Sequence, residues 1–146
     1  MELSGTVSVI LHQKNSSLWS IDPMAKVYDA IALMAEKGVG ALPVIQGGKL
    51  IGMISERDYT RKVMLKGKSS RETPVVEIMS DALVVARPGD SVVECMETMT
   101  ERRIRHLPVM EGEQLIGIIS IGDLVKWIIS AQTATIDQLT KYVFGE

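Results

Sequence analysis

Hydrophobic residues along this chain alternate between two periods, and the order of these periods predicts a small unit of mixed helix and strand. From Val27 to Ala35 the apolar positions recur at helical spacing, and Gly38 follows as a left-handed helix stop. Two short apolar runs come next, separated by Gln46-Gly47-Gly48 as a hairpin turn. The predicted elements are strand 18–21, helix 27–38, strand 41–45, strand 50–55 and helix 56–65.

The same pattern occurs a second time. Lys49–Asp58 reappears 65 positions later as Gln114–Asp123, and Leu42-Pro43-Val44 reappears at the same offset. The second copy predicts strand 83–86, helix 92–101, strand 106–110, strand 115–120 and helix 121–130. One such unit has a thin core, and pairing the copies would bury the helix faces left open. The expected fold class is α/β, or α+β, with two tandem β-α-β-β-α units packed about a pseudo-twofold axis.

The segments outside the two copies set the expected boundaries. Val7–Leu11 resembles Val75–Met79 at an offset of 68, and Thr73-Pro74 predicts an N-cap and first turn of a short helix that ends at Met79. Apolar residues at helical spacing near the C-terminus predict a helical tail that docks on the body or on a partner. The expected division is unit 1 over 1–65, a linker and short helix over 66–79, unit 2 over 80–130 and a tail over 131–146.

Composition narrows the class of protein. The 146 residues carry a net charge of −2, and 46% of them are hydrophobic, which is typical of a folded domain and unfavourable for general nucleic-acid binding. We expect no membrane span and no secretory signal, hence a cytoplasmic protein. Cys95 is the lone cysteine and lies in an apolar-periodic segment, so we expect a packed thiol. No Cys or His pair has metal-ligand spacing, and no metal is expected.

Each copy ends its last strand with Gly-x-x-Ser-x-x-Asp. The first motif contains Gly52, Ser55 and Asp58, and the second contains Gly117, Ser120 and Asp123. Serine three residues before an acid at a helix start also describes a capping box. A carboxylate in the same place can instead accept from a ribose diol, while the glycine would let a ligand approach the backbone. Both interpretations remain open at this point.

With these motifs the chain resembles the CBS domains, which are named after cystathionine β-synthase and occur in pairs called Bateman modules. It is most similar to stand-alone bacterial pairs, through Ser55–Tyr59 and Arg103–Val109. The resemblance implies an adenosyl ligand in clefts between the units: AMP, ADP, ATP, NAD(H) or S-adenosylmethionine. It also implies that the two motif acids hold ribose hydroxyls, with the motif serines beside them. Adenine would lie near Trp19 and Val84.

A cluster of cations follows the first helix of the second copy. It contains Arg102, Arg103, Arg105 and His106. These cations could simply offset the C-terminal helix dipole, which is worth about 0.3–1 kcal/mol. The resemblance implies instead that Arg105 and His106 meet phosphate.

The first copy lacks these charges. Its corresponding positions are Gly40 and Ala41, so a phosphate there would need Arg57, Arg61 or a residue of the partner unit. Arg57 is unusual at a helix start, where a cation opposes the dipole. We therefore expect two unequal sites, with the Asp123 site favoured for a phosphorylated nucleotide.

No catalytic arrangement of nucleophile, base and orienting group is visible, so we expect no enzyme. The expected function is regulatory adenine-nucleotide binding, in energy or redox sensing, signalled by conformational change to an unknown effector protein. The resemblance implies a homodimer formed through the helices, to which Met24, Met34, Met96 and Met99 could contribute if they are not core. The alternatives are a scaffold without ligand and a nucleic-acid binder that uses the arginines.

Overall fold

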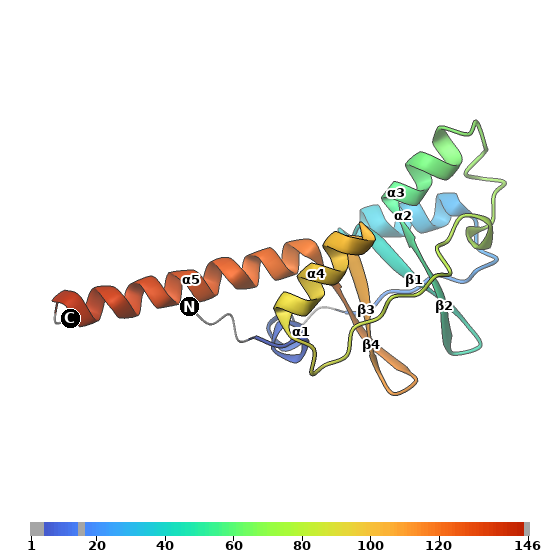
Figure 1. The fold of residues 1–146 in the computed structure, drawn as a ribbon. Coiled ribbons are helices and arrows are strands. Elements are labelled where there is room, and N and C mark those ends of the chain that lie inside the picture. The colour runs from blue at the N-terminus through green and yellow to red at the C-terminus, as the bar shows by residue number, and fades with distance from the viewer. Residues whose placement is uncertain (1–4, 15–16, 145–146) are drawn as a thin grey trace. The chain divides into compact units, whose positions relative to one another are not determined.

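The computed structural model describes residues 5–14 and 17–144, which fold into two compact units of mixed helix and strand (Figure 1). One unit, named here the Asp58 unit, contains the elements between Ser17 and Val84. The other, the Asp123 unit, contains the N-terminal helix and most of the second repeat. Each unit has a two-stranded antiparallel sheet. The expected mixed fold class is confirmed.

The Asp58 unit is built on strands β1 (Ala41–Gln46) and β2 (Lys49–Ser55). They pair antiparallel from Ala41↔Ser55 to Gln46↔Lys49, with one irregularity after Val44. Helix α2 (Val27–Lys37) packs its apolar face into the core and ends at Gly38 in the left-handed conformation, as predicted. The expected strand 18–21 is reduced to one parallel bridge between Ile21 and Val44.

The helix predicted over 56–65 has two parts. It begins as α3 (Glu56–Tyr59) and continues as a π-helix, η1 (Thr60–Met64), in which the amide of Leu65 donates to the carbonyl of Thr60. Val63 of the π segment is buried in the core of the unit, whereas Met64 and Leu65 are exposed. The π-helical turn therefore coincides with the burial of Val63 alone among these three apolar residues. The helical spacing in the sequence does not predict this wider turn.

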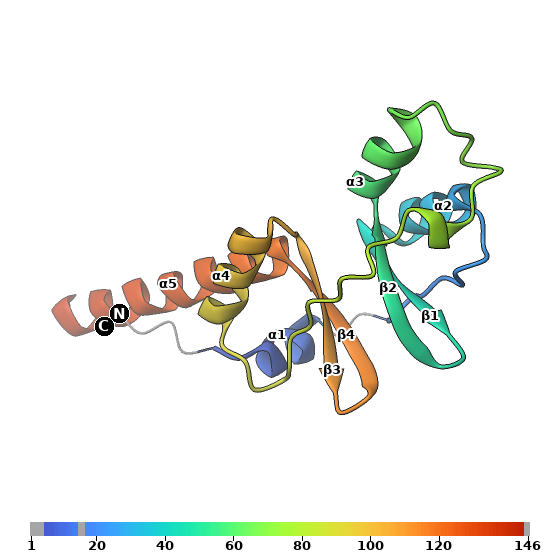
Figure 2. The same cartoon turned by 45° about the vertical axis from the view of Figure 1, so that its right-hand side comes forward.

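The Asp123 unit repeats this plan with α4 (Val92–Arg102), β3 (His106–Glu111), β4 (Gln114–Ser120) and α5 (Ile121–Phe144). The expected strand 83–86 contributes one parallel bridge, from Ala86 to Val109. The C-terminal tail is a continuation of α5, which runs on past the other elements of its unit (Figures 1 and 2). None of the helices described is long and apolar enough to cross a membrane.

The segment that precedes each repeat completes the other repeat. The short 3-10 helix η2 (Val75–Glu77) joins the Asp58 unit, where the amide of Val75 donates to the carbonyl of Ala25 at 2.8 Å. Helix α1 (Val7–Lys14) joins the Asp123 unit, where the amide of Val7 donates to the carbonyl of Asp90 at 2.9 Å. This grouping differs from the expected division, which followed chain order.

The predicted N-cap at Thr73 is wrong. Residue Pro74 occupies the cap position of η2, and the hydroxyl of Thr73 donates to the carbonyl of Ser69 instead. Thr73 is the buried polar residue of this segment, and its carbonyl accepts from the amide of Val27. The hydroxyl of Thr73 thus bonds to the preceding turn, and its carbonyl bonds to the first residue of α2. Neither group caps the helix that follows.

Candidate functional site

Both serine–aspartate pairs form reciprocal caps at the junction of a strand and a helix. At the start of α3 the amide of Asp58 donates to Ser55 Oγ at 3.2 Å, and the amide of Ser55 donates to Asp58 Oδ2 at 2.9 Å. At the start of α5 the same two bonds join Ser120 and Asp123 at 3.1 and 2.8 Å. The capping interpretation is therefore confirmed in both repeats, and each carboxylate is held in place by its own helix.

The motif glycines make room for the protein and not for a ligand, contrary to the expectation. A side chain at Gly52 would lie 2.7 Å from Met79 Sδ and 2.9 Å from the Ser80 carbonyl oxygen. A side chain at Gly117 would lie 2.6 Å from Leu11 Cδ2. Residues 7–14 and 75–79, which each complete one of the units, are named here the crossover segments. Met79 and Leu11 are equivalent residues of these two segments, at the offset of 68 noted in the sequence. The glycines are thus needed where these segments pack on the last strand.

A lysine from α1 reaches the carboxylate of Asp123. Lys14 Nζ lies 2.9 Å from Asp123 Oδ2 and donates to the carbonyl of Ile118, also at 2.9 Å. The two side chains are 28% and 22% exposed, so the ion pair is partly shielded from water. Nothing in the local sequence near Asp123 indicates this partner, because it lies more than a hundred residues away.

A different lysine performs the same role in the Asp58 unit. Lys62 Nζ lies 3.1 Å from Asp58 Oδ1 and donates to the carbonyl of Ile78 at 2.9 Å. Lys62 follows Asp58 by four residues, so this pair lies on one helical face. Each acid is therefore tied to a crossover segment through a lysine, although the two lysines come from unrelated positions in the repeats.

Arg105 lies between the end of α4 and the start of β3, and His106 is the first residue of β3, close to the start of α5. The carbonyl of Arg105 accepts from the amide of Ile121, the first residue of α5, at 2.8 Å. Burial lowers the pKa of His106, the charges of Lys14 and Arg105 lower it further, and Asp123 opposes the shift. His106 is therefore a neutral hydrogen-bonding group near neutral pH.

Asp123 remains ionised although it is partly buried. Burial raises its pKa, but the hydrogen bonds from Lys14 and Ser120, together with the ammonium charge, outweigh this effect and leave the pKa below its ordinary value. The Asp123 unit thus combines one fixed carboxylate with the cations Lys14 and Arg105 and a neutral imidazole. This set can accept from a diol and also donate to an anion.

The equivalent place in the Asp58 unit has no charged residue at the two positions that precede and begin the first strand of its hairpin. The amide of Glu56 donates to the carbonyl of Gly40 at 3.1 Å, which is the counterpart of the bond between Ile121 and Arg105. Gly40 and Ala41 thus stand where Arg105 and His106 stand in the other unit. Arg57 is half-buried on the first turn of α3. The two acids therefore have the same backbone setting but unequal surroundings.

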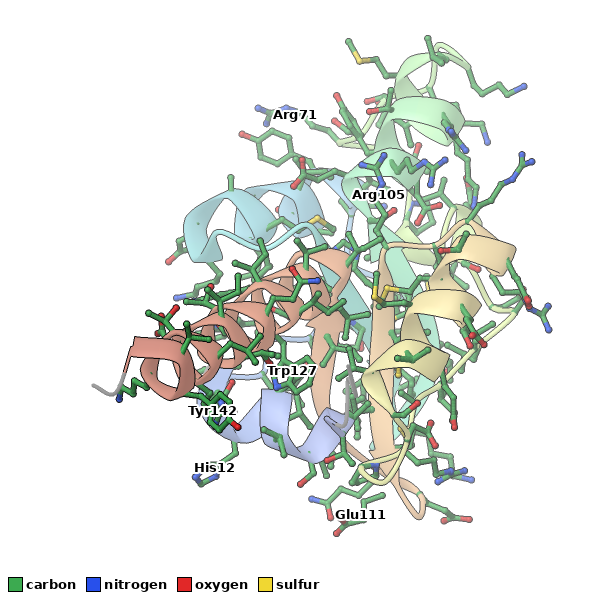
Figure 3. All side chains as sticks on the ribbon, turned by 60° about the vertical axis from the view of Figure 1, so that its left-hand side comes forward. His12, Arg71, Arg105, Glu111, Trp127 and Tyr142 are labelled. Carbon is green, nitrogen blue, oxygen red and sulfur yellow. The ribbon has the colours of Figure 1, made fainter. Side chains whose placement is uncertain are left out.

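The remaining candidates lie as follows. Trp19 is 37% exposed, and Lys37 Nζ lies 4.1 Å from the centre of its ring. Val84 is half-buried in the segment after η2. Figure 3 shows Arg105 at the end of the Asp123 unit opposite His12 and Glu111, which line an open hollow with Ser8 and Leu11. That hollow is separate from the carboxylate of Asp123.

The structure also places Arg103, the lone cysteine and three of the methionines considered for the homodimer. Arg103 ends α4 in the left-handed conformation, with φ of 55°, where the first repeat has Gly38. Cys95 is buried, and burial together with Asp90 and Glu94 raises its pKa to about 11, which confirms a packed thiol. Met34 and Met99 are core residues, whereas Met24 is exposed.

The comparisons with known proteins agree with this architecture. The CBS domain family matches residues 14–65 and 75–130. A solved structure of a protein with CBS domains from Burkholderia ambifaria MC40-6 is 49% identical, with a TM-score of 0.84 over 88% of this chain and 96% of that one. The mitochondrial CBS domain-containing protein CBSX3 of Arabidopsis thaliana is 37% identical over 99% of this chain and 77% of its own. The chain therefore belongs to the CBS domain family and contains a pair of these domains.

A more distant structure shares the fold. The CBS domain pair of protein MJ0100 was solved in complex with 5′-methylthioadenosine and S-adenosyl-L-methionine. It is 20% identical to this chain, with a TM-score of 0.75 over 88% of this chain and 98% of that one. The ligands belong to that protein, and the likeness extends to the fold.

Proposed function

We propose that this chain is a regulatory module that binds an adenine nucleotide, of the class AMP, ADP, ATP or NAD(H), at Asp123. The observation that carries the proposal is the ionised carboxylate of Asp123, fixed by Ser120 and surrounded by Lys14, Arg105 and His106. A ribose diol needs an acceptor of this kind, and the attached phosphate needs nearby donors. CBS domain pairs are known as regulatory modules, and the same fold carries adenosyl ligands in protein MJ0100.

Asp58 forms the second, weaker site of the proposal. Its carboxylate has the same cap and a lysine partner, but Gly40 and Ala41 supply no charge where the other unit has Arg105 and His106. A phosphorylated nucleotide should therefore favour Asp123. In this proposal Ser55, Arg57, Trp19 and Val84 remain predicted contacts of the ligand.

The experiment is a thermal-shift and calorimetric titration with AMP, ADP, ATP, NAD⁺, NADH, S-adenosylmethionine and GTP. Ligand at 100 times its Kd adds about 2.7 kcal/mol of stability, which corresponds to a shift of about 5–10 °C for a chain of this size. The main variant is Asp123→Asn, because the amide oxygen still accepts from the Ser120 backbone and preserves much of the cap. Asp58→Asn is the matched control in the other repeat.

We expect adenine compounds to bind. The affinity should be lost in Asp123→Asn and in Arg105→Ala and largely retained in Asp58→Asn.

A scaffold without ligand predicts no thermal shift with any compound, in protein freed of co-purified nucleotide. In that case Asp123→Asn would affect only stability. A nucleic-acid function would appear as steeply salt-dependent binding without preference among mononucleotides. Either result would refute the proposal.

We also propose that the signal reaches an effector protein through a homodimer. Beyond Ser130, α5 carries apolar side chains that its own unit leaves open: Ile136 is 61% exposed, and Leu139 and Tyr142 are more than half exposed. Large apolar side chains exposed at helical spacing on one helix favour a protein partner. Light scattering of the wild type and of Ile136→Glu/Leu139→Glu tests this point, and an equal monomer mass for both proteins would refute the homodimer.

A further inference from the structure

We propose that Lys14 makes the Asp123 site selective for a phosphorylated ligand. In the free protein Lys14 pairs with Asp123. When the ribose of a ligand binds the carboxylate, Lys14 pairs with the phosphate of that ligand instead. The proposal deepens the proposed function and rests on it. It assigns a role to a residue of α1, outside the repeated motif, and all the groups involved belong to the Asp123 unit.

The hydrogen bonds at Asp123 show which donor can leave. Oδ2 accepts from the amide of Ser120 at 2.8 Å and from Lys14 Nζ at 2.9 Å. The first bond belongs to the cap of α5 and is fixed by the backbone, whereas the second comes from a long side chain. A carboxylate has roughly four acceptor positions, two on each oxygen, and the bonds from Ser120 and Lys14 occupy both positions of Oδ2. A ribose diol that donates to both oxygens therefore brings a third donor to Oδ2, where it competes with the lysine side chain and not with the backbone amide of Ser120.

The fate of the displaced ammonium decides which ligands bind well. Apart from Asp123, Lys14 Nζ donates to the carbonyl of Ile118, which carries no full charge. A partly buried ammonium without a counter-charge is unfavourable. A ligand phosphate restores that counter-charge, and a neutral nucleoside does not. The exchange thus penalises adenosine more than AMP.

The neighbouring groups support the same direction. Lys14 and Arg105 both lower the pKa of His106, so both cations lie within electrostatic reach of this imidazole. The phosphate would enter a cluster in which Lys14 and Arg105 carry positive charge and His106 is neutral. The carbonyl of Arg105 accepts from the amide of Ile121, so the backbone of Arg105 lies at the start of α5, two residues before Asp123.

The test measures the affinities of AMP and adenosine by calorimetry for the wild type, Lys14→Met, Lys14→Arg and Lys126→Met. Lys14→Met should weaken AMP about tenfold, as expected for one charge-assisted hydrogen bond, and should leave adenosine unchanged or tighter. Lys14→Arg should keep the preference for AMP. Lys126→Met removes the same charge from an exposed position on α5 and should keep the ratio of the two affinities.

The other outcomes distinguish the two proposals. If Lys14→Met weakens AMP and adenosine by the same factor, or changes neither, Lys14 only supports the site and this inference is overturned. If the wild type binds neither compound, nor any other nucleotide, the proposed function itself fails. Thermal unfolding of Lys14→Met establishes that the variant is folded, and Lys14→Arg keeps the test valid if it is not.

Discussion

Replacing Gly52 with alanine should destabilise the protein more than the same replacement at the equivalent Gly117. At Gly52 the new methyl group would lie 2.9 Å from the Ser80 carbonyl oxygen. That carbonyl accepts from the amide of Met53 at 3.0 Å, and the amide of Ser80 donates to the carbonyl of Met53 at 2.8 Å. The backbone therefore cannot move away without weakening this pair of bonds.

At Gly117 the nearest atom is the end of a side chain. The new methyl group would lie 2.6 Å from Leu11 Cδ2, and the leucine is only half-buried, so it can rotate. Overpacking in a core costs about 1–3 kcal/mol, and replacing glycine within a strand returns about 0.5–1 kcal/mol. We expect a loss of about 2 kcal/mol for Gly52→Ala and of less than about 1 kcal/mol for Gly117→Ala.

Urea unfolding followed by circular dichroism measures both values, and second substitutions separate the causes. Leu11→Ala should remove the effect of Gly117→Ala, because it removes the clashing atoms. Met79→Ala should relieve Gly52→Ala only in part, because the Ser80 carbonyl remains in place. A loss at Gly117 as large as that at Gly52, or full relief of Gly52→Ala by Met79→Ala, would refute this reasoning.

Three further predictions concern single residues. Arg103→Gly should raise the free energy of unfolding by about 0.5–1 kcal/mol, measured in urea, because φ of 55° suits glycine, and a loss of stability would show that arginine contacts matter more. The lowered pKa of His106 means that the unfolded state takes up a proton first as the pH falls below about 6.5, so stability should decrease there and His106→Gln should reduce the decrease. Cys95 should react with iodoacetamide at neutral pH only after unfolding, and rapid labelling of the folded protein, detected by mass spectrometry, would contradict its burial.

The local sequence was sufficient for much of the fold. The two hairpins, the stop at Gly38 and the reciprocal caps at Ser55 and Ser120 depend on residues within a few positions of one another. The duplication itself identified the pair of units, because residues that pack inward recur with the same spacing in both copies. Hydrophobic period and turn chemistry act over short range, and a single sequence contains that information.

The partners of the motifs could be assigned only from the tertiary structure. The sequence shows that Val7–Leu11 resembles Val75–Met79, but not that each segment completes the other repeat and fills the space beside Gly117 or Gly52. Nor does it show that Lys14 reaches Asp123, since the two residues are far apart in the chain. Such contacts depend on which segment covers an open strand, and that is decided by packing between distant parts of the chain rather than by local preference.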